Sequence, residues 1–142
     1  MKIAIGSDHG GYLLKEDIKK HLTKRKAEFK DFGAYSEVSV DYPDIGKKVA
    51  KAVASKKYKF GILVCGTGLG MSMVANKVRG IRAALCHSVY TAQMSRAHND
   101  ANVLSLGGRV LKKELALKIV DAFLKTPFEG GRHLRRVRKI EK

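Results

Sequence analysis

The sequence predicts an α/β fold in which helices cover both faces of a parallel sheet. Short apolar runs rich in Ile and Val alternate along the chain with longer segments that carry an apolar stripe at helical spacing. With 142 residues, 44% of them hydrophobic, the chain is long enough for one domain with a real core. This alternation is typical of β-α-β units, so we expect a three-layer α/β/α sandwich with a five-stranded, Rossmann-like parallel sheet.

The five apolar runs are predicted to be strands because each is short and bounded by polar residues or glycine. They are Lys2–Gly6, Glu28–Phe32, Phe60–Cys65, Ile81–Cys86 and Asn102–Leu106. Five helices are predicted between and after them, each with one apolar stripe facing the sheet. In chain order, their stripes carry Leu14, Ile18 and Leu22; Ile45, Val49 and Val53; Met71, Val74, Ala75 and Val78; Val89 and Ala92; and Leu115, Ile119 and Phe123.

The pattern changes beyond Pro127, where the chain becomes short, glycine-containing and basic. We expect residues 1–142 to form a single domain in which residues 127–142 are a C-terminal arm. The arm is too short and too basic to have a core of its own. We therefore expect it to dock on a partner subunit.

The charge is strongly positive, with 29 Lys and Arg against 13 Asp and Glu and a formal net charge of +16. Taken alone, this excess indicates an acidic partner such as nucleic acid. Most lysines, however, lie in the helical segments opposite the apolar stripes, where a solvated face would place them. We favour solvated faces, so nucleic acid is not the expected partner, although residues 132–139 do concentrate arginine.

No apolar run approaches the length of a membrane span, and the first residues turn to glycine before an apolar signal region develops. We therefore expect a cytoplasmic protein without membrane contact. Cys65 and Cys86 share no Cys-x-x-Cys spacing and are expected to be free thiols. No ligand spacing groups the histidines either, so neither a metal nor an organic cofactor is expected.

Ligands of open parallel sheets bind outside the carboxyl ends of the strands, so the residues that flank the strands are the first candidates for a site. The first strand ends in Gly6–Gly11 and the third in Cys65–Gly70. The fifth is preceded by His98–Asp100 and followed by Gly107–Arg109. We expect these polar side chains to converge on one edge of the sheet.

The glycine loop Gly66–Gly70 opens the third predicted helix, where free backbone N–H groups favour an anion. Its G-x-G-x-G spacing differs from the G-x-G-x-x-G of dinucleotide folds, and no Gly-Lys-Ser/Thr is present. NAD and nucleoside triphosphates are therefore disfavoured. The alternative is a turn that only needs residues with positive φ; the three alternating glycines favour a ligand loop.

Cys65 ends a buried strand next to the start of that helix, a setting that favours the thiolate as a base or nucleophile. From the residues alone an inert core thiol remains an equal alternative. Cys86 has no glycine loop after it and is interpreted as structural. His9 and His98 fall in loops at the proposed edge, and Asp8 could bind sugar hydroxyls or cap the following helix.

These segments together resemble the type B ribose-5-phosphate isomerases, whose family also includes galactose-6-phosphate isomerase. The resemblance runs nearly from end to end and rests on ordered blocks. The blocks are Gly6–Gly11, Asp41–Pro43, Cys65–Gly70, Ala75–Lys77, Gly80–Ala83, His98–Leu104, Gly107–Arg109 and Glu129–His133. One branch of the family has a glutamate base after the glycine loop; this position is Met71, which places the sequence in the cysteine branch.

The resemblance implies three catalytic residues: Cys65 as the thiol base, Thr67 as its neighbouring hydroxyl and His98 as the group that opens the sugar ring. It also implies a larger set that binds the sugar, the phosphate and the developing charge. These residues are Asp8, His9, Gly66, Gly68, Leu69, Gly70, Asn99, Arg109, Arg132, His133 and Arg136. Family members are homodimers or dimers of dimers with sites completed across the interface, which would explain the docking arm.

The reaction implied is aldose-ketose isomerisation of ribose 5-phosphate and ribulose 5-phosphate through an enediolate, without a cofactor. Two alternatives stay open. One is an isomerase of a six-carbon substrate such as allose 6-phosphate or galactose 6-phosphate. The other is a non-catalytic module that binds phosphate or nucleic acid, which the charge would favour.

Overall fold

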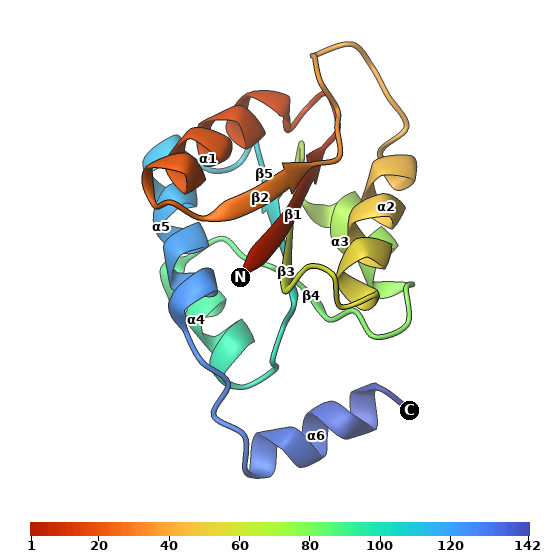
Figure 1. Ribbon diagram of the computed structural model, residues 1–142, viewed down its shortest axis with the longest axis vertical. Coiled ribbons are helices and arrows are strands. Elements are labelled where there is room, and N and C mark those ends of the chain that lie inside the picture. Colours follow the sequence, from red (N-terminus) through yellow and green to blue (C-terminus); the bar gives the residue numbers. More distant parts are fainter.

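A computed structural model describes residues 1–142 and contains a sheet of five strands, ordered β2-β1-β3-β5-β4 (Figure 1). All neighbouring strands pair in parallel. The elements are β1 (Lys2–Ser7), α1 (Tyr12–Lys24), β2 (Glu28–Asp31), α2 (Tyr42–Ala54), β3 (Phe60–Cys65), α3 (Leu69–Asn76), β4 (Ala83–Leu85), α4 (Val89–Ala97), β5 (Val103–Gly107), α5 (Lys113–Lys125) and α6 (Arg132–Ile140). The predicted five-stranded parallel sheet is confirmed.

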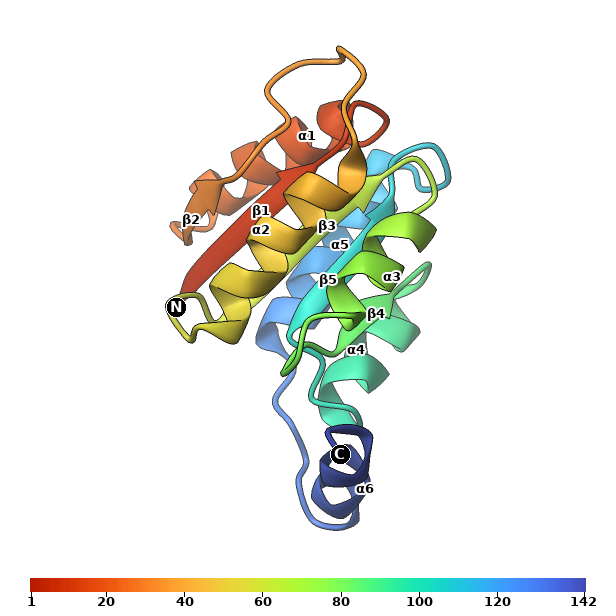
Figure 2. The same cartoon turned by 90° about the vertical axis from the view of Figure 1, so that its right-hand side faces the viewer.

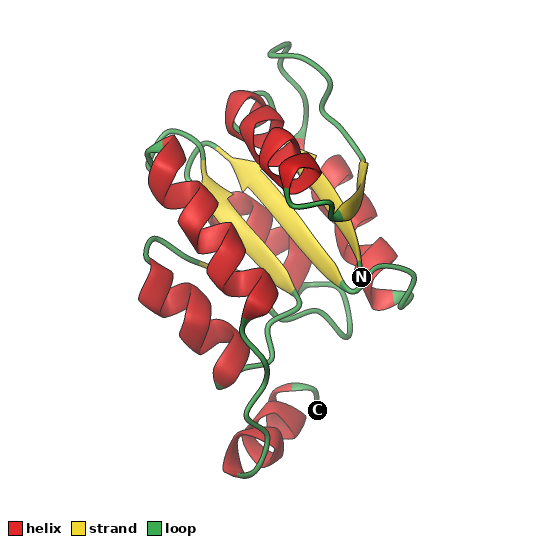
Figure 3. Cartoon of the chain, turned by 60° about the vertical axis from the view of Figure 1, so that its left-hand side comes forward, coloured by secondary structure: helices red, strands yellow, loops and turns green.

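Two apolar layers enclose this sheet. The larger core lies between the sheet and helices α1, α4 and α5, where Ile18, Ile119 and Phe123 are completely buried. The smaller core packs α2 and α3 on the opposite face through Val49 and Met71. Figure 3 shows the helices on either side of the strands, so the predicted three-layer sandwich is confirmed.

The fourth strand is shorter than predicted, because β4 covers only Ala83–Leu85 instead of Ile81–Cys86. A side chain interrupts the ladder at its start: the backbone N–H of Arg82 donates to Asn102 Oδ1 at 2.8 Å. The amide of Asn102 also donates to the Gly80 carbonyl. A side-chain bridge of this kind replaces strand pairing, and apolar periodicity cannot reveal it.

The direction in which successive strands are added to the sheet reverses between β1 and β3. The connection through α1 leads from β1 to β2 on one side, and the connection through α3 leads from β3 toward β4 on the other. Such a switch point opens a crevice at the carboxyl ends of the two central strands. The segments after β1 and β3 therefore meet where a parallel α/β fold binds its ligands.

The C-terminal arm ends in a helix that the sequence did not predict, α6. It lies beyond the amino ends of the strands and away from the sandwich (Figures 1 and 2). Only His133 and Val137 are buried among its residues. The helix was missed because the segment is short, mostly basic and preceded by two glycines, so it was interpreted as an arm although Leu134, Val137 and Ile140 recur at helical spacing. No helix in the structure combines the length and apolar character needed to cross a bilayer.

Candidate active site

Cys65 is the last residue of β3, and its thiol lies under the first turn of α3. The backbone N–H of Gly68 donates to Cys65 Sγ at 3.1 Å. Gly68 has φ +81°, a left-handed conformation that lets the loop turn back over the sulfur. Cys65 is 5% exposed, so the sulfur sits at the edge of the core and not in open solvent. The N–H···S contact stabilises negative charge on this sulfur.

The rest of the glycine loop presents free donors. The backbone N–H groups of Gly66, Thr67 and Gly70 make no hydrogen bond within the chain. Leu69 N–H donates to Thr67 Oγ1 at 3.2 Å, which holds the Thr67 hydroxyl over the same turn. Unpaired N–H groups at a helix start form a binding site for an oxyanion or phosphate. This geometry favours the ligand-loop interpretation over a turn that is only structural.

Asp8 and His9 follow β1 and lie beside this loop. The Asp8 carboxylate accepts from the Gly11 N–H at 2.9 Å, so one of its oxygens closes the turn before α1. Val40 N–H donates to His9 Nδ1 at 3.3 Å. Because Nδ1 accepts, the neutral His9 ring carries its proton on Nε2, which leaves that nitrogen as a donor to a ligand.

Arg109 enters the same site from the segment after β5. Its backbone N–H donates to the Gly66 carbonyl at 2.9 Å. The guanidinium of Arg109 lies over two glycines. A Cβ added at Gly10 would lie 3.3 Å from Arg109 Cζ, and a Cβ added at Gly66 would lie 3.2 Å from Arg109 Nη1. The missing side chains thus make room for a planar cation that can bind two phosphate oxygens.

The structure corrects one expectation about this edge. His98 and Asn99 do not join Cys65 within the chain, because they precede β5 and residues before a parallel strand lie at its amino end. His98 is the C-terminal cap of α4, and Asn99 follows it in the segment that leads to β5. Only residues that follow a strand can reach the carboxyl edge directly.

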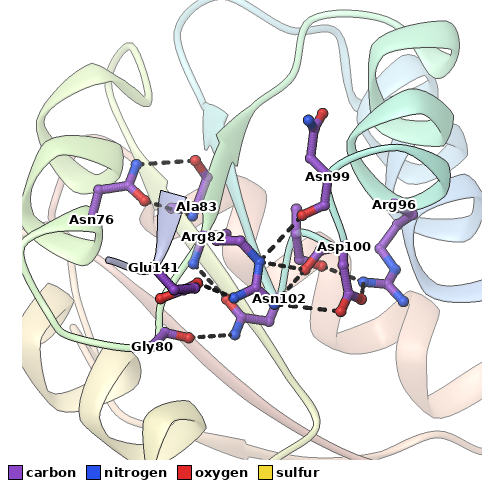
Figure 4. A network of polar contacts seen from close by, with 10 residues as sticks. Asn76, Gly80, Arg82, Ala83, Arg96, Asn99, Asp100, Asn102 and Glu141 are labelled. Atoms are coloured by element: carbon purple, nitrogen blue, oxygen red, sulfur yellow. Dashed lines mark hydrogen bonds and ion pairs between the residues drawn. The ribbon is translucent and has the colours of Figure 1, made fainter. Parts of the chain in front are cut away.

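Arg82 organises the amino edge around Asn99 (Figure 4). Its guanidinium donates to the Asn99 carbonyl at 3.2 Å and to the Asp100 carbonyl at 3.0 and 2.9 Å. It also forms an ion pair with Glu141, just beyond α6. One partly buried cation therefore ties the loop that carries His98 and Asn99 to the end of the arm.

A second connection between arm and sandwich consists of imidazole rings. The rings of His98 and His133 stack with centroids 4.2 Å apart and planes 8° from parallel. Glu129 Oε1 lies 3.8 Å from His98 Nε2 and 3.6 Å from His133 Nε2. Burial lowers the pKa of His133, and the positive charges of His98 and Arg132 lower it further against the opposing effect of Glu129. Glu129 is the member of this cluster that sequence reasoning missed.

The candidate residues thus fall into two groups. The carboxyl edge gathers Asp8, His9, Cys65, Gly66, Thr67, Gly68, Leu69, Gly70 and Arg109. The amino edge gathers His98, Asn99, Arg132, His133 and Arg136. Cys86 belongs to neither group: it is 1% exposed, and burial raises the pKa of its thiol, which makes it a poor source of thiolate.

The fold and the carboxyl edge define a Rossmann-like α/β protein with a glycine loop of unpaired N–H groups next to a thiol. The sequence model of the Ribose/Galactose Isomerase family matches residues 3–140. The chain belongs to this family.

Relatives that span nearly the whole chain support this assignment. Ribose-5-phosphate isomerase B of Escherichia coli is 52% identical over 139 residues, which are 98% of this chain and 93% of that protein. The solved structure of Clostridium thermocellum ribose-5-phosphate isomerase B has a TM-score of 0.98 at 60% identity and covers 99% of this chain and 95% of its own. Ribose-5-phosphate isomerase B from Mycoplasma genitalium, solved with bound ribulose 5-phosphate, has a TM-score of 0.94 at 46% identity, covering 99% and 93%.

Proposed function

We propose that this protein interconverts ribose 5-phosphate and ribulose 5-phosphate, with Cys65 as the base that moves the proton. The observation that carries the reaction is the end-to-end likeness to ribose-5-phosphate isomerase B proteins, one of them solved with ribulose 5-phosphate. The chemistry is supported by the Gly68 N–H on Cys65 Sγ and by the free N–H groups that surround it.

In the open-chain aldose, the Cys65 thiolate takes the proton from C2. The electron pair of that C–H bond forms the C1–C2 double bond, and the aldehyde oxygen becomes the oxyanion of an enediolate. The N–H groups of Gly66, Thr67 and Gly70 stabilise this oxyanion, an effect typically worth about 3 kcal/mol of barrier per donor. The thiol then returns its proton to C1, O2 loses its proton to O1, and C2 becomes the ketone carbonyl.

The aldose must first be opened, because ribose 5-phosphate is mainly a closed furanose. His98 can shuttle the ring proton near neutral pH, but its edge of the sheet is opposite the Cys65 edge of the same chain. We therefore propose that each site combines Cys65 of one protomer with His98 and Asn99 of a second. The arm supplies Arg132, His133 and Arg136 to hold the phosphate of that site.

Such a two-chain site explains why the arm extends from the sandwich. α6 carries its arginines on an exposed surface, with Arg132 and Arg136 in solvent. A homodimer, or a dimer of dimers, lets this surface reach a neighbour, whereas within one chain these cations face no phosphate site. The proposed two-chain site therefore requires the proposed dimer.

The direct test is turnover of the purified protein against a panel of five- and six-carbon aldose phosphates. We expect ribulose 5-phosphate from ribose 5-phosphate, with at least about tenfold lower kcat/KM for allose 6-phosphate. The family description also names galactose, so preferred turnover of a six-carbon sugar phosphate would reassign the substrate. No turnover of any member of the panel would reject the catalytic proposal.

A further inference from the structure

His98, Glu129 and His133 form a compact cluster at the amino edge, which we call the His–Glu–His cluster. They come from three separate places: the end of α4, the linker of the arm and the first turn of α6. One potential ligand atom from each residue lies within 4.8 Å of the other two. Sequence spacing could not reveal this grouping, because the arm folds back to bring Glu129 to the end of α4.

One atom of this cluster is buried without a partner. The His133 side chain is 9% exposed, and its Nε2 makes no hydrogen bond. Glu129 Oε1 lies 3.6 Å from this nitrogen, beyond hydrogen-bonding range for the pair. A buried nitrogen that faces a carboxylate without bonding to it requires an explanation, because burying it in this way costs free energy.

The spacing of the three atoms is close to that of a metal site. Around a tetrahedral ion with bonds of about 2.0–2.1 Å, neighbouring ligand atoms lie about 3.3–3.4 Å apart. Glu129 Oε1 lies 3.6 and 3.8 Å from the two Nε2 atoms. Two of the three distances between potential ligand atoms therefore approach those around one metal ion.

We propose that the His–Glu–His cluster binds a divalent transition-metal ion of the Zn²⁺ class through His98 Nε2, Glu129 Oε1 and His133 Nε2. Two imidazoles and one carboxylate form a donor set that suits this ion, and solvent or a substrate oxygen fills the fourth position. Magnesium and calcium, which prefer oxygen ligands, are poorer candidates.

The two rings must rearrange for the ion to bind. Their planes are 8° from parallel, and two stacked imidazoles cannot direct their lone pairs at one point. The His98 side chain is 38% exposed and Glu129 is 55% exposed, so both can turn while the buried His133 stays fixed. The backbone of Glu129 is already anchored, since its N–H donates to the Ala97 carbonyl at 3.0 Å.

The charged groups around the His–Glu–His cluster determine how tightly it should bind a metal ion. Glu129 is the acidic group of the cluster, whereas the positive charge of Arg132 and Arg136 reaches His133 and opposes a cation. We expect a dissociation constant of about 1–10 µM, weaker than a structural zinc site with thiolate ligands.

Binding at this place would inhibit the enzyme. This consequence rests on the proposed function, in which His98 opens the sugar ring and His133 helps to hold the phosphate. An ion bound to both nitrogens removes them from the substrate, so metal and sugar phosphate compete. The cluster would then act as an inhibitory site for transition-metal ions, on the opposite edge of its own chain from Cys65.

The test is calorimetric titration of Zn²⁺ into the full-length Cys65→Ala protein. This variant lacks the Cys65 sulfur, which could bind the ion at a second place. We expect one ion per chain and an affinity at least about tenfold lower when Glu129→Gln is added. Glu114→Gln, at an exposed carboxylate on α5, is the matched control and should leave the affinity unchanged. Absence of binding, or equal binding with and without Glu129→Gln, would overturn the proposal.

Calorimetry does not depend on turnover, so failure of the isomerase assignment would leave the binding result intact. The inhibitory role is tested separately, with Cys65 present. Zinc inhibition of ribose 5-phosphate turnover should need about tenfold more Zn²⁺ in Glu129→Gln than in Glu114→Gln. Equal inhibition of the two variants would reject the inhibitory role.

Discussion

The backbone N–H of Gly68 donates to Cys65 Sγ at 3.1 Å, which connects the thiol to the first turn of α3. This contact uses one of the loop donors, while the N–H groups of Gly66, Thr67 and Gly70 stay unpaired. The proposed base and the proposed oxyanion site therefore belong to one short segment. Any change to the path of that segment affects both.

Removing the thiol should abolish the reaction without unfolding the chain. In Cys65→Ala we expect kcat to fall by at least about a thousandfold, because the variant lacks the proposed base for the carbon-bound proton. A steady-state assay of ribulose 5-phosphate formation measures this loss. Cys86→Ala is the control and should keep its kcat, and turnover retained in Cys65→Ala would show that the base lies elsewhere.

Gly68→Ala should disturb both the fold and the site. An added Cβ would lie 2.5 Å from Leu85 Cδ1 and 3.0 Å from the Leu106 carbonyl carbon, and φ there is +81°. We expect the free energy of unfolding to fall by about 2–3 kcal/mol. Denaturant titration measures this change.

Gly80→Ala separates backbone strain from steric clash. Gly80 has φ +87°, but an added Cβ would meet nothing within 4 Å. Its loss of stability should be smaller, about 1 kcal/mol, with little change in turnover. Equal losses in the two variants would show that packing at Gly68 has no special role.

Arg132→Ala should weaken phosphate recognition more than chemistry. A planar guanidinium that binds the phosphate equally in ground and transition states contributes to KM, so we expect KM to rise about tenfold with a small change in kcat. Inhibition by free phosphate should weaken in parallel. Arg138→Ala on the same helix is the control, and an unchanged KM in Arg132→Ala would remove the arm from the site.

The buried pair of Lys15 and Asp31 should make stability depend on acid pH. Lys15 is completely buried and its Nζ lies 2.8 Å from Asp31 Oδ1. Burial alone would raise the pKa of Asp31, but hydrogen bonds from Lys15, the Gly33 N–H and Lys19 outweigh it and lower the pKa. The pair therefore stabilises the fold above the pKa of the unfolded carboxyl and loses this effect as pH falls through the lower, folded value.

Asp31→Asn tests that pair because it removes the carboxylate beside the buried Lys15 side chain. At pH 7 we expect the free energy of unfolding to drop by about 3 kcal/mol. The difference from wild type should shrink as the pH falls below about 4. Urea titrations across pH give both numbers, with exposed Glu37→Gln as the control. A difference that stays constant down to pH 2 would contradict the linkage.

The sequence predicted the central strands well because their apolar runs are too short for helices and are bounded by polar residues or glycine. The prediction of β3 as Phe60–Cys65 matches to the residue, since six buried positions lie between a lysine and a glycine loop. The helix α6 was missed because the short, arginine-rich segment after Gly131 was interpreted as an arm, although Leu134, Val137 and Ile140 recur at helical spacing.

The site was predicted in its composition but not in its arrangement. Cys65, Thr67 and Asp8 follow strands, so a rule about carboxyl ends locates them correctly. The same rule was applied wrongly to His98, which precedes a strand and lies at the opposite edge. Glu129 began one of the family blocks, but nothing in the sequence placed it beside His98, because that proximity depends on how the arm returns to α4.

In the proposed enzyme, a working site needs Cys65 from one chain and His98 from another. The decisive measurement mixes the inactive variants Cys65→Ala and His98→Ala, after dissociation and reassembly, and follows the recovery of turnover. The mixed dimers carry one site with both residues intact, so a random equal mixture should recover about a quarter of wild-type turnover per chain. A mixture that stays inactive, although exchange of labelled subunits is complete, would contradict the account.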